Sequence, residues 1–105
     1  MKLHRILWAT VLVHAAFDFS LADPFGQEGI FSMLWSRGKP YYGEKPVICG
    51  HTPLPLEEIQ AGLKTNRIRI DNGCCYLNHL GQRRLLAYGL DDGRLYIQPN
   101  IEDPY

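Results

Sequence analysis

The amino-acid sequence predicts an α/β protein in which a mixed β-sheet is flanked by helices, and three observations lead to this class. Residues 6–13 (ILWATVLV) are apolar on both faces and rich in β-branched residues, which is typical of an inner strand, although a helix fits so short a run equally well. Residues 23–35 carry helix signals. Residues 84–90 and 94–98 flank Asp-Asp-Gly, and Asp-Gly between two such runs is a strong hairpin signal.

The expected helix begins at Asp23, which suits an N-cap, with Pro24 in the first turn. Its apolar side chains recur at roughly helical spacing, at Phe25, Ile30, Met33 and Leu34. Ser-Arg-Gly at 36–38 ends the helix. Two glycines and two prolines then predict a loop over residues 38–46.

The second half of the chain alternates short strands with one short helix. Residues 47–49 form a buried strand, and Pro53 and Pro55 forbid its continuation into a central sheet. Residues 56–63 are expected to form one or two helical turns. Residues 67–71 (RIRID) alternate, with Ile68 and Ile70 facing inward, and Asn-Gly then predicts a turn before residues 74–77 resume the sheet. The hairpin is expected at the edge of the same sheet.

Length and charge exclude several classes of protein. The 105 residues fit one domain, 1–105, with a loose tail at 99–105. Eleven basic residues balance eleven acidic ones, so neither a nucleic acid nor an anionic membrane is an expected partner. The three cysteines (Cys49, Cys74 and Cys75) are a poor disulfide framework, since their number is odd and two are adjacent. Reduced thiols favour the cytoplasm.

One alternative concerns residues 1–22, which resemble a secretory signal peptide. A basic start precedes an apolar run, and Ser-Leu-Ala at 20–22 looks like a cleavage site. His14 interrupts that run and Asp18 lies just before the supposed site, so the cytoplasmic interpretation is preferred. The run is also shorter than the roughly 20 apolar residues that a membrane-spanning helix needs.

Polar residues follow three of the predicted strands, and two of them are histidines. His14 follows the first strand, and His51 follows the second, between Gly50 and Thr52. Functional residues gather where strands end in loops, and imidazole is a common ligand for manganese, iron and zinc. Gly50 would let the backbone or a ligand come close to His51. The alternative is that each histidine is an ordinary, partly buried side chain.

Several motifs occur in an order that resembles a known family. VHAAF, MLWSR, GHTP, RIDNGC and LLAYGLDDGRL appear in turn between about residues 11 and 98. This series resembles the C-terminal half of the calcineurin-like metallophosphoesterases, closest to their serine/threonine protein phosphatase and diadenosine tetraphosphatase branch. The resemblance implies the C-terminal half of a four-layer sandwich of mixed sheets and helices.

The resemblance also implies roles for three residues. His14 and His51 correspond to ligands of one ion in a two-metal centre, with manganese expected and iron or zinc as alternatives. Arg37 corresponds to a residue that reaches the substrate phosphate, where a guanidinium fork suits phosphoryl oxygens; otherwise Arg37 is a solvated cation at a helix end. Asp71 corresponds to an acidic turn position with a structural role. Substrates of the family are phosphoproteins or dinucleoside polyphosphates.

The sequence departs from the family pattern in ways that affect activity. Asp-x-His, Gly-Asp-x-x-Asp-Arg-Gly and Gly-Asn-His-Asp/Glu, which supply the remaining ligands, do not occur in it. Ala16 stands where the family usually has glycine, at a cost of about 1 kcal/mol if that position needs a positive φ. We therefore expect a phosphoester-hydrolase half-domain that is inactive alone and holds at most one ion weakly. The alternatives are a non-catalytic interaction module, which self-associates or pairs with a separate N-terminal half, and a small secreted protein.

Overall fold

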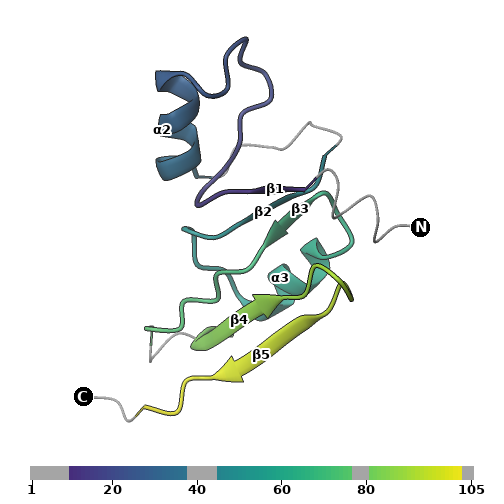
Figure 1. Ribbon diagram of the computed structural model, residues 1–105. Helices are drawn as coiled ribbons and strands as arrows, with labels where there is room; N and C mark the ends of the chain where they lie inside the picture. Colours follow the sequence, from purple (N-terminus) through teal and green to yellow (C-terminus); the bar gives the residue numbers. More distant parts are fainter. Residues whose placement is uncertain (1–9, 38–44, 77–80, 103–105) are drawn as a thin grey trace.

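The computed structural model describes residues 10–37, 45–76 and 81–102, and within them the protein is of the α/β class (Figure 1). Two helices and two sheets make up this part of the chain. In chain order the elements are β1 (Val11–Leu12), α2 (Gln27–Trp35), β2 (Val47–Cys49), α3 (Leu56–Gly62), β3 (Arg67–Arg69), β4 (Arg84–Tyr88) and β5 (Leu95–Pro99). The predicted loop at 38–46 lies largely outside the described residues, as do positions 6–9 of the first predicted strand.

A three-stranded parallel sheet in the order β1-β2-β3 forms the centre of the molecule. Its register places Leu12, Ile48 and Ile68 on one line across the sheet. α3 packs beside β3 and buries Ile59 completely, so Ile48, Ile59 and Ile68 belong to the core. The expectation that the first strand is an inner strand is wrong for the described residues, because β1 lies at the edge of this sheet and Leu12 is exposed.

The predicted hairpin is confirmed, but it does not join the parallel sheet. β4 and β5 pair antiparallel as a separate two-stranded sheet. The expected strand at 74–77 is also wrong where the structure describes it, since residues 74–76 form a turn. Gly73 there has φ +66°, and its carbonyl accepts a hydrogen bond from the amide of Tyr76 at 2.9 Å. The chain therefore bends away from the sheet, and a tight turn rather than a strand leads toward the hairpin.

Asn72 joins these parts through its side-chain amide, which is 1% exposed. The nitrogen and the oxygen of this amide both have hydrogen-bond partners. Its Nδ2 donates to the carbonyls of Leu54 and Gly81, each at 2.8 Å, and its Oδ1 accepts from the amide of Arg84 at 3.1 Å. The amide of Arg83 also donates to its backbone carbonyl. One buried amide thus ties the end of β3 to the loop before α3 and to the start of the hairpin, and a buried amide is stable only when it is bonded in this way.

The start of the tail is also held in place. Pro99 still belongs to β5, and the amide of Asn100 donates to the carbonyl of Arg83 at 2.8 Å. The side chain of Asn100 donates to the carbonyl of Cys74 at 2.7 Å. The loose tail expected from residue 99 therefore does not begin there, because the hairpin continues to that point and is tied to the turn at residue 74.

The predicted helix forms as α2, with a different start, and most of its large apolar side chains are exposed. Its N-cap is Gly26 rather than Asp23, and Asp23 instead accepts the amide of Phe25 in a turn before the helix. Its two buried residues are Gly29 and Ser32. A Cβ on Gly29 would lie 1.7 Å from the carbonyl oxygen of Pro24, so only glycine allows the helix to approach that backbone. The close approach fixes the glycine side as the inner side.

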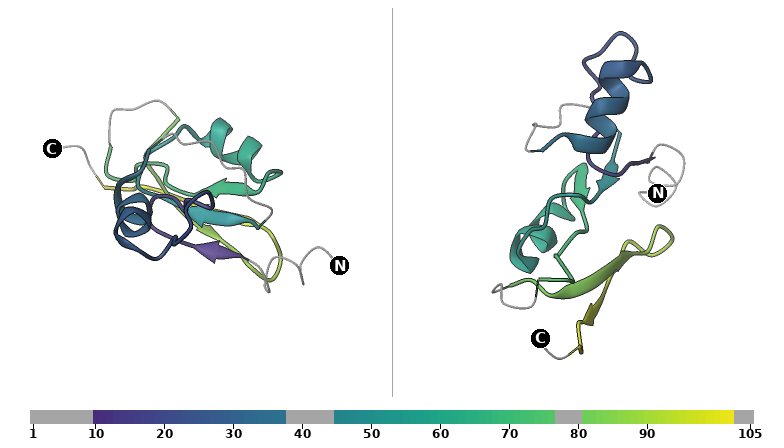
Figure 2. Two further views of the ribbon diagram at one scale, coloured as in Figure 1. Left: turned by 90° about the horizontal axis from the view of Figure 1, so that it is seen from above. Right: turned by 90° about the vertical axis from the view of Figure 1, so that its left-hand side faces the viewer.

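The molecule is thin and incompletely covered. Its principal extents are 47 × 34 × 17 Å, and Figure 2 shows α2 at one end, the hairpin at the other, and the parallel sheet with α3 between them. Parallel sheets normally have both faces covered. No helix in the part of the chain that the structure describes is both long and apolar enough to cross a bilayer.

Candidate functional site: a histidine pair at the end of the parallel strands

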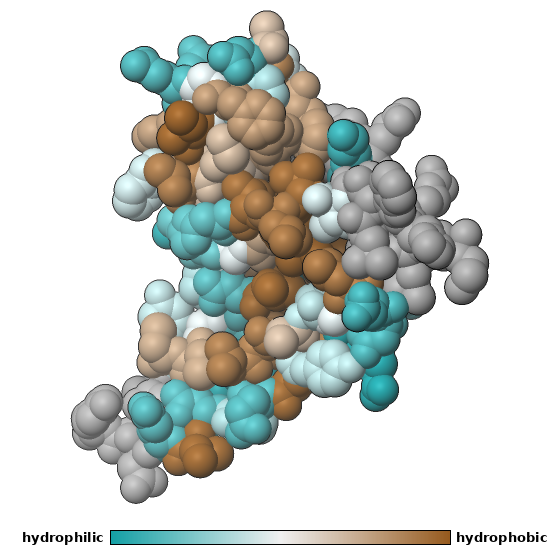
Figure 3. Space-filling model, in the orientation of Figure 1, coloured by the Kyte–Doolittle hydropathy of each residue, from teal (hydrophilic) through white to brown (hydrophobic). Residues whose placement is uncertain are grey.

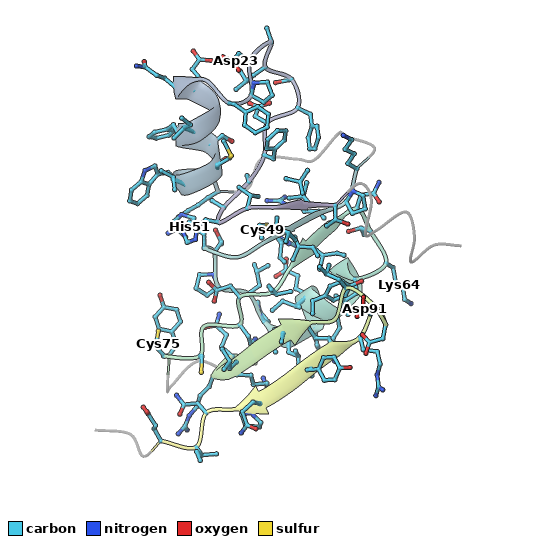
Figure 4. All side chains as sticks on the ribbon, in the orientation of Figure 1. Asp23, Cys49, His51, Lys64, Cys75 and Asp91 are labelled. Atoms are coloured by element: carbon cyan, nitrogen blue, oxygen red, sulfur yellow. The ribbon has the colours of Figure 1, made fainter. Side chains whose placement is uncertain are left out.

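The two candidate histidines leave neighbouring parallel strands at the same edge of the sheet. β1 and β2 run side by side, and the hydrogen bonding continues past their ends. The amide of Val13 donates to the carbonyl of Ile48 at 3.1 Å, and the amide of Gly50 donates to the carbonyl of His14 at 2.8 Å. Parallel strands end at a common edge, so residues that follow them come together in space. Figure 4 shows His51 there, between the end of β2 and α2.

The structure brings the two imidazoles into direct contact. Nε2 of His14 lies 3.0 Å from Nδ1 of His51, although the residues are 37 positions apart in the chain. The ring centroids are 4.8 Å apart and the ring planes are inclined by 60°. His14 is exposed and His51 is half-buried, so the pair faces solvent. In this geometry one nitrogen can donate a proton to the other, and the tautomers decide which does so.

His51 has a strained backbone. Its φ is +73°, and the amide of Thr52 donates to the carbonyl of Gly50 at 2.9 Å, so His51 is the central residue of a three-residue γ-turn. The γ-turn with a positive central φ is rare and strained, and such strain gathers at functional sites. The close approach of backbone expected at Gly50 does not occur among the described residues, while the approach of a ligand stays a prediction. A Cβ there would meet the Cβ of Asp71 at 3.6 Å, an ordinary contact, so the unusual conformation belongs to the histidine itself.

The end of α2 adds two residues to the pair. The Trp35 ring lies edge-on to His51, with centroids 6.1 Å apart and planes inclined by 82°. Nη1 of Arg37 lies 3.5 Å from Oγ1 of Thr52, a long hydrogen bond to the residue after His51. The structure thus places Arg37 beside the histidine pair. The contact between Trp35 and His51 was not predicted, because sequence spacing does not show which way the end of a helix faces.

Asp71 has the structural role expected of it. Its Oδ1 accepts the amide of Gly73 at 2.9 Å, which closes the turn after β3. Among the described residues, no group of three or more His, Cys, Asp or Glu side chains gathers that could hold a metal ion. The histidine pair is therefore a two-ligand arrangement in this part of the chain.

The nitrogen separation suits two ligands of one metal ion. If metal–nitrogen bonds are about 2.1 Å long, two nitrogens at the right angle of an octahedral ion lie about 3.0 Å apart, whereas tetrahedral zinc would separate them by about 3.4 Å. Nε2 of His14 and Nδ1 of His51 have the shorter separation. A hydrogen bond between the two nitrogens has the same length, so the distance is compatible both with a bound metal ion and with a shared proton. Water would have to supply the remaining ligands, as it does around divalent ions with few protein ligands.

Cys49, the cysteine next to the site in sequence, is not a candidate for the chemistry. All three cysteines are free thiols, as expected, and Cys49 is buried in β2 beneath the site. Burial raises the pKa of the Cys49 thiol, while the nearby guanidinium groups of Arg67 and Arg69 oppose this rise. A buried thiol with a raised pKa remains protonated and is neither a nucleophile nor a metal ligand.

Comparisons with family models, with curated proteins and with solved structures gave no match to this chain. The likeness to metallophosphoesterases therefore stays a prediction from sequence motifs. The cost considered for Ala16 does not arise, since positive φ among the described residues other than glycine occurs only at His51 and Arg83.

Proposed function

We propose that this chain is the C-terminal half of a calcineurin-like metallophosphoesterase domain and that it is inactive as a phosphatase by itself. One observation carries the proposal: two imidazoles delivered by neighbouring parallel strands meet with their nitrogens 3.0 Å apart. The strained γ-turn at His51 supports it, because an ordinary surface histidine has no need of such a backbone. On this proposal the parallel sheet and α3 form part of one half of the four-layer sandwich.

Each residue of the site has a distinct task in this proposal. His14 and His51 bind one divalent ion through the two facing nitrogens, with manganese as the expected metal and iron or zinc as alternatives. Arg37, held beside Thr52, contacts an oxygen of the phosphate group. When bound, the ion would act as a Lewis acid on a phosphoryl oxygen. The substrate class is a phosphoester, either a phosphorylated serine or threonine in a protein or a dinucleoside polyphosphate.

Inactivity follows from the missing ligands. Two-metal hydrolases hold their ions about 3.5–4 Å apart, with one ion activating water and the other stabilising the leaving oxygen. Two neutral imidazoles leave the charge of even one divalent ion uncompensated, and nothing in the described residues holds a second ion. Weak binding of one ion without turnover is the expected behaviour. The free cysteines favour the cytoplasm as the compartment.

Calorimetric titration with Mn²⁺ tests the metal site. The unmodified chain should bind about one ion weakly, and both His14→Ala and His51→Asn should abolish the heat of binding. Asparagine is the sharper substitution at position 51 because it tolerates a left-handed backbone, so the γ-turn is retained and only the ring is lost. His79→Asn is the matched control and should bind as the unmodified chain does. Binding that survives removal of both rings would refute the site.

An assay with p-nitrophenyl phosphate and Mn²⁺ tests the second part of the proposal. The unmodified chain should show no turnover above that of the metal alone. Robust turnover that is lost in His51→Asn would show that the chain is a complete enzyme, which contradicts the half-site proposal while keeping the histidines as ligands. Turnover unaffected by His51→Asn would contradict both.

A second candidate function, a non-catalytic interaction module, is favoured by a specific observation: α2 presents large apolar side chains to solvent. The two proposals are compatible, since a half-domain can persist as a binding module. The third candidate is a secreted protein with a signal peptide at 1–22, of which residues 1–9 lie outside the described part of the chain. N-terminal sequencing of the protein from a secreting host would decide it.

A further inference from the structure

α2 is oriented with its large apolar residues outward. Two pairs of residues four apart, Ile30 with Leu34 and Phe31 with Trp35, form one continuous strip, since residues at this spacing are neighbours on a helix surface. Their exposed fractions are 48% for Ile30, 65% for Phe31, 46% for Leu34 and 60% for Trp35. We call these four residues the α2 strip. Figure 3 shows apolar side chains gathered over α2 and the adjoining sheet edge.

The opposite side of α2 carries Gly29, Ser32 and the half-buried Met33, and its two fully buried residues are the small ones, which makes the orientation unusual. Gly29 and Ser32 are buried, and Oγ of Ser32 finds no hydrogen-bond partner among the described residues. A surface helix normally buries its apolar side and exposes its polar side. Rotation of α2 to hide the strip would break the close approach of Gly29 to Pro24. The fold therefore keeps the α2 strip exposed to solvent. The strip can be buried only by contact with another surface.

The strip is large enough to be an interface. From the areas of large side chains, its four residues expose on the order of 450 Å², at the upper end of what isolated monomers show as one apolar patch. Two such strips placed together would bury about 900 Å² of apolar area, before the flanking polar residues are counted. A stable interface buries at least about 1,000 Å² in total. Two strips therefore supply most of this area, and the residues that flank them must supply the rest.

The charges around the strip favour a second copy in one orientation. The strip itself is uncharged, Glu28 lies in the first turn of α2, and Arg37 lies just beyond its end. Glu28 and Arg37 are equally distant in sequence from the centre of the strip. A two-fold axis through that centre, with the helices antiparallel, would place Glu28 of each copy near Arg37 of the other. A net charge of zero adds no long-range repulsion between copies.

We propose that a second copy of this chain docks on the α2 strip and forms a two-fold symmetric dimer with antiparallel α2 helices. Closed two-fold dimers are the commonest homo-oligomers. Because Trp35 belongs to the strip and contacts His51, the dimer interface adjoins the histidine pair. The proposal stands on burial and charge, and it does not depend on the phosphoesterase proposal.

Sedimentation velocity on the full chain over a range of concentrations tests the dimer. The unmodified chain should sediment as a dimer at high concentration and dissociate on dilution. Phe31→Glu places two like charges at the two-fold interface and should weaken the dimer at least about 100-fold. Ile101→Glu makes the same change at an exposed residue outside the strip and should leave the dimer intact. Circular dichroism should show an unchanged fold for both variants, since both side chains are exposed.

Fluorescence tests the dimer without a substitution in the α2 strip. In a Trp8→Phe background the emission comes from Trp35 alone, because the chain has two tryptophans. Iodide quenching of Trp35 should increase as the protein is diluted and the dimer dissociates. A chain that is monomeric at every concentration, a Phe31→Glu variant that dimerises as tightly as the original, or quenching that is independent of concentration would each overturn the proposal. Loss of the dimer in Ile101→Glu as well would place the interface elsewhere and overturn it too.

Discussion

Two regions of this molecule satisfy their polar and apolar groups to very different degrees. Around Asn72, every nitrogen and oxygen of a buried amide side chain is bonded, and the apolar residues of α3 and β3 are covered. Around the histidine pair and α2, two imidazoles form a hydrogen bond only with each other among the described residues, and the α2 strip faces solvent. We refer to these as the Asn72 region and the histidine region. The first holds the fold together by itself, whereas the second offers groups that other molecules can satisfy.

This difference separates stability from function in the chain. Buried polar groups must be bonded within the protein, because water cannot reach them, so the Asn72 region has little freedom to do anything else. Strained backbone and exposed apolar area in the histidine region reduce stability when nothing is bound. Groups of this kind are retained where they bind a metal, a substrate or another chain. Substitutions in the two regions should therefore have different consequences.

The largest expected effect comes from Asn72→Ala. The substitution leaves the carbonyls of Leu54 and Gly81 and the amide of Arg84 without their buried partner, and we expect a loss of about 2–4 kcal/mol in the free energy of unfolding. Such a loss is a large part of the stability of a small domain. Urea denaturation followed by circular dichroism measures it.

Asn100→Ala is the matched control for Asn72→Ala. Asn100 is half-buried, and its side chain donates to the carbonyl of Cys74 and accepts from the exposed amide of Glu102, so the loss should be about 1 kcal/mol. Equal losses in the two variants would contradict the central place of Asn72.

Gly29→Ala should have a smaller and local effect in the histidine region. The new Cβ would meet the carbonyl oxygen of Pro24 at 1.7 Å, so α2 must move, at a cost of about 1–3 kcal/mol. Hydrogen exchange should speed up at the amides of α2 and remain unchanged in β3. Gly50→Ala is the control, because its Cβ would make only ordinary contacts. Faster exchange throughout the chain would show that the two regions unfold together and would remove the distinction drawn between them.

The smallest expected effect concerns acid at the exposed tip of the hairpin. The hydroxyl of Tyr96 and the amide of Arg94 donate to Asp92 and lower the pKa of its carboxyl, while Asp92 in turn raises the pKa of Tyr96. A lowered pKa in the folded state means that this contribution to stability is present above the ordinary Asp pKa and is lost as the pH falls through the folded-state pKa. The tip of the hairpin should therefore loosen only in acid.

Chemical shifts of the β4–β5 amides across an acid titration would measure this loosening. Asp92→Asn should remove the acid-dependent change, and Asp91→Asn, at the neighbouring position, should retain it. A tip that keeps its shifts at low pH in the unmodified chain would show that the two hydrogen bonds do not hold it.

Local patterns were sufficient to predict several elements. The apolar run at 47–49, the alternation that starts at Arg67 and the Asp-Gly pair at 92–93 predicted β2, β3 and the hairpin, because each depends on neighbours in the chain. The positions of His14 and His51 at strand ends were predicted in the same way. What the pattern could not supply was the separation of the two rings, which depends on the pairing of β1 with β2.

Other expectations failed because they concern packing between distant segments. Apolar spacing predicted the helix α2 but not its orientation, and the approach of Gly29 to Pro24 leaves Ile30 and Leu34 exposed. An apolar strand at residues 6–13 suggested an inner position, whereas β1 lies at the edge of the described sheet. The hairpin was expected on the same sheet and forms its own. Asn72 gave no signal at all beyond an Asn-Gly turn.

The sequence by itself determined where the strands and helices of this protein form and which residues follow them, because hydrophobic periodicity and turn chemistry act between near neighbours. Only the tertiary structure decided that His14 and His51 share one point in space, that α2 faces outward and that Asn72 holds three segments together. These features depend on strand pairing, on steric limits between backbones and on the need to bond buried polar groups. Such constraints act between residues far apart in the chain, so their outcome cannot be read from any short stretch of the sequence.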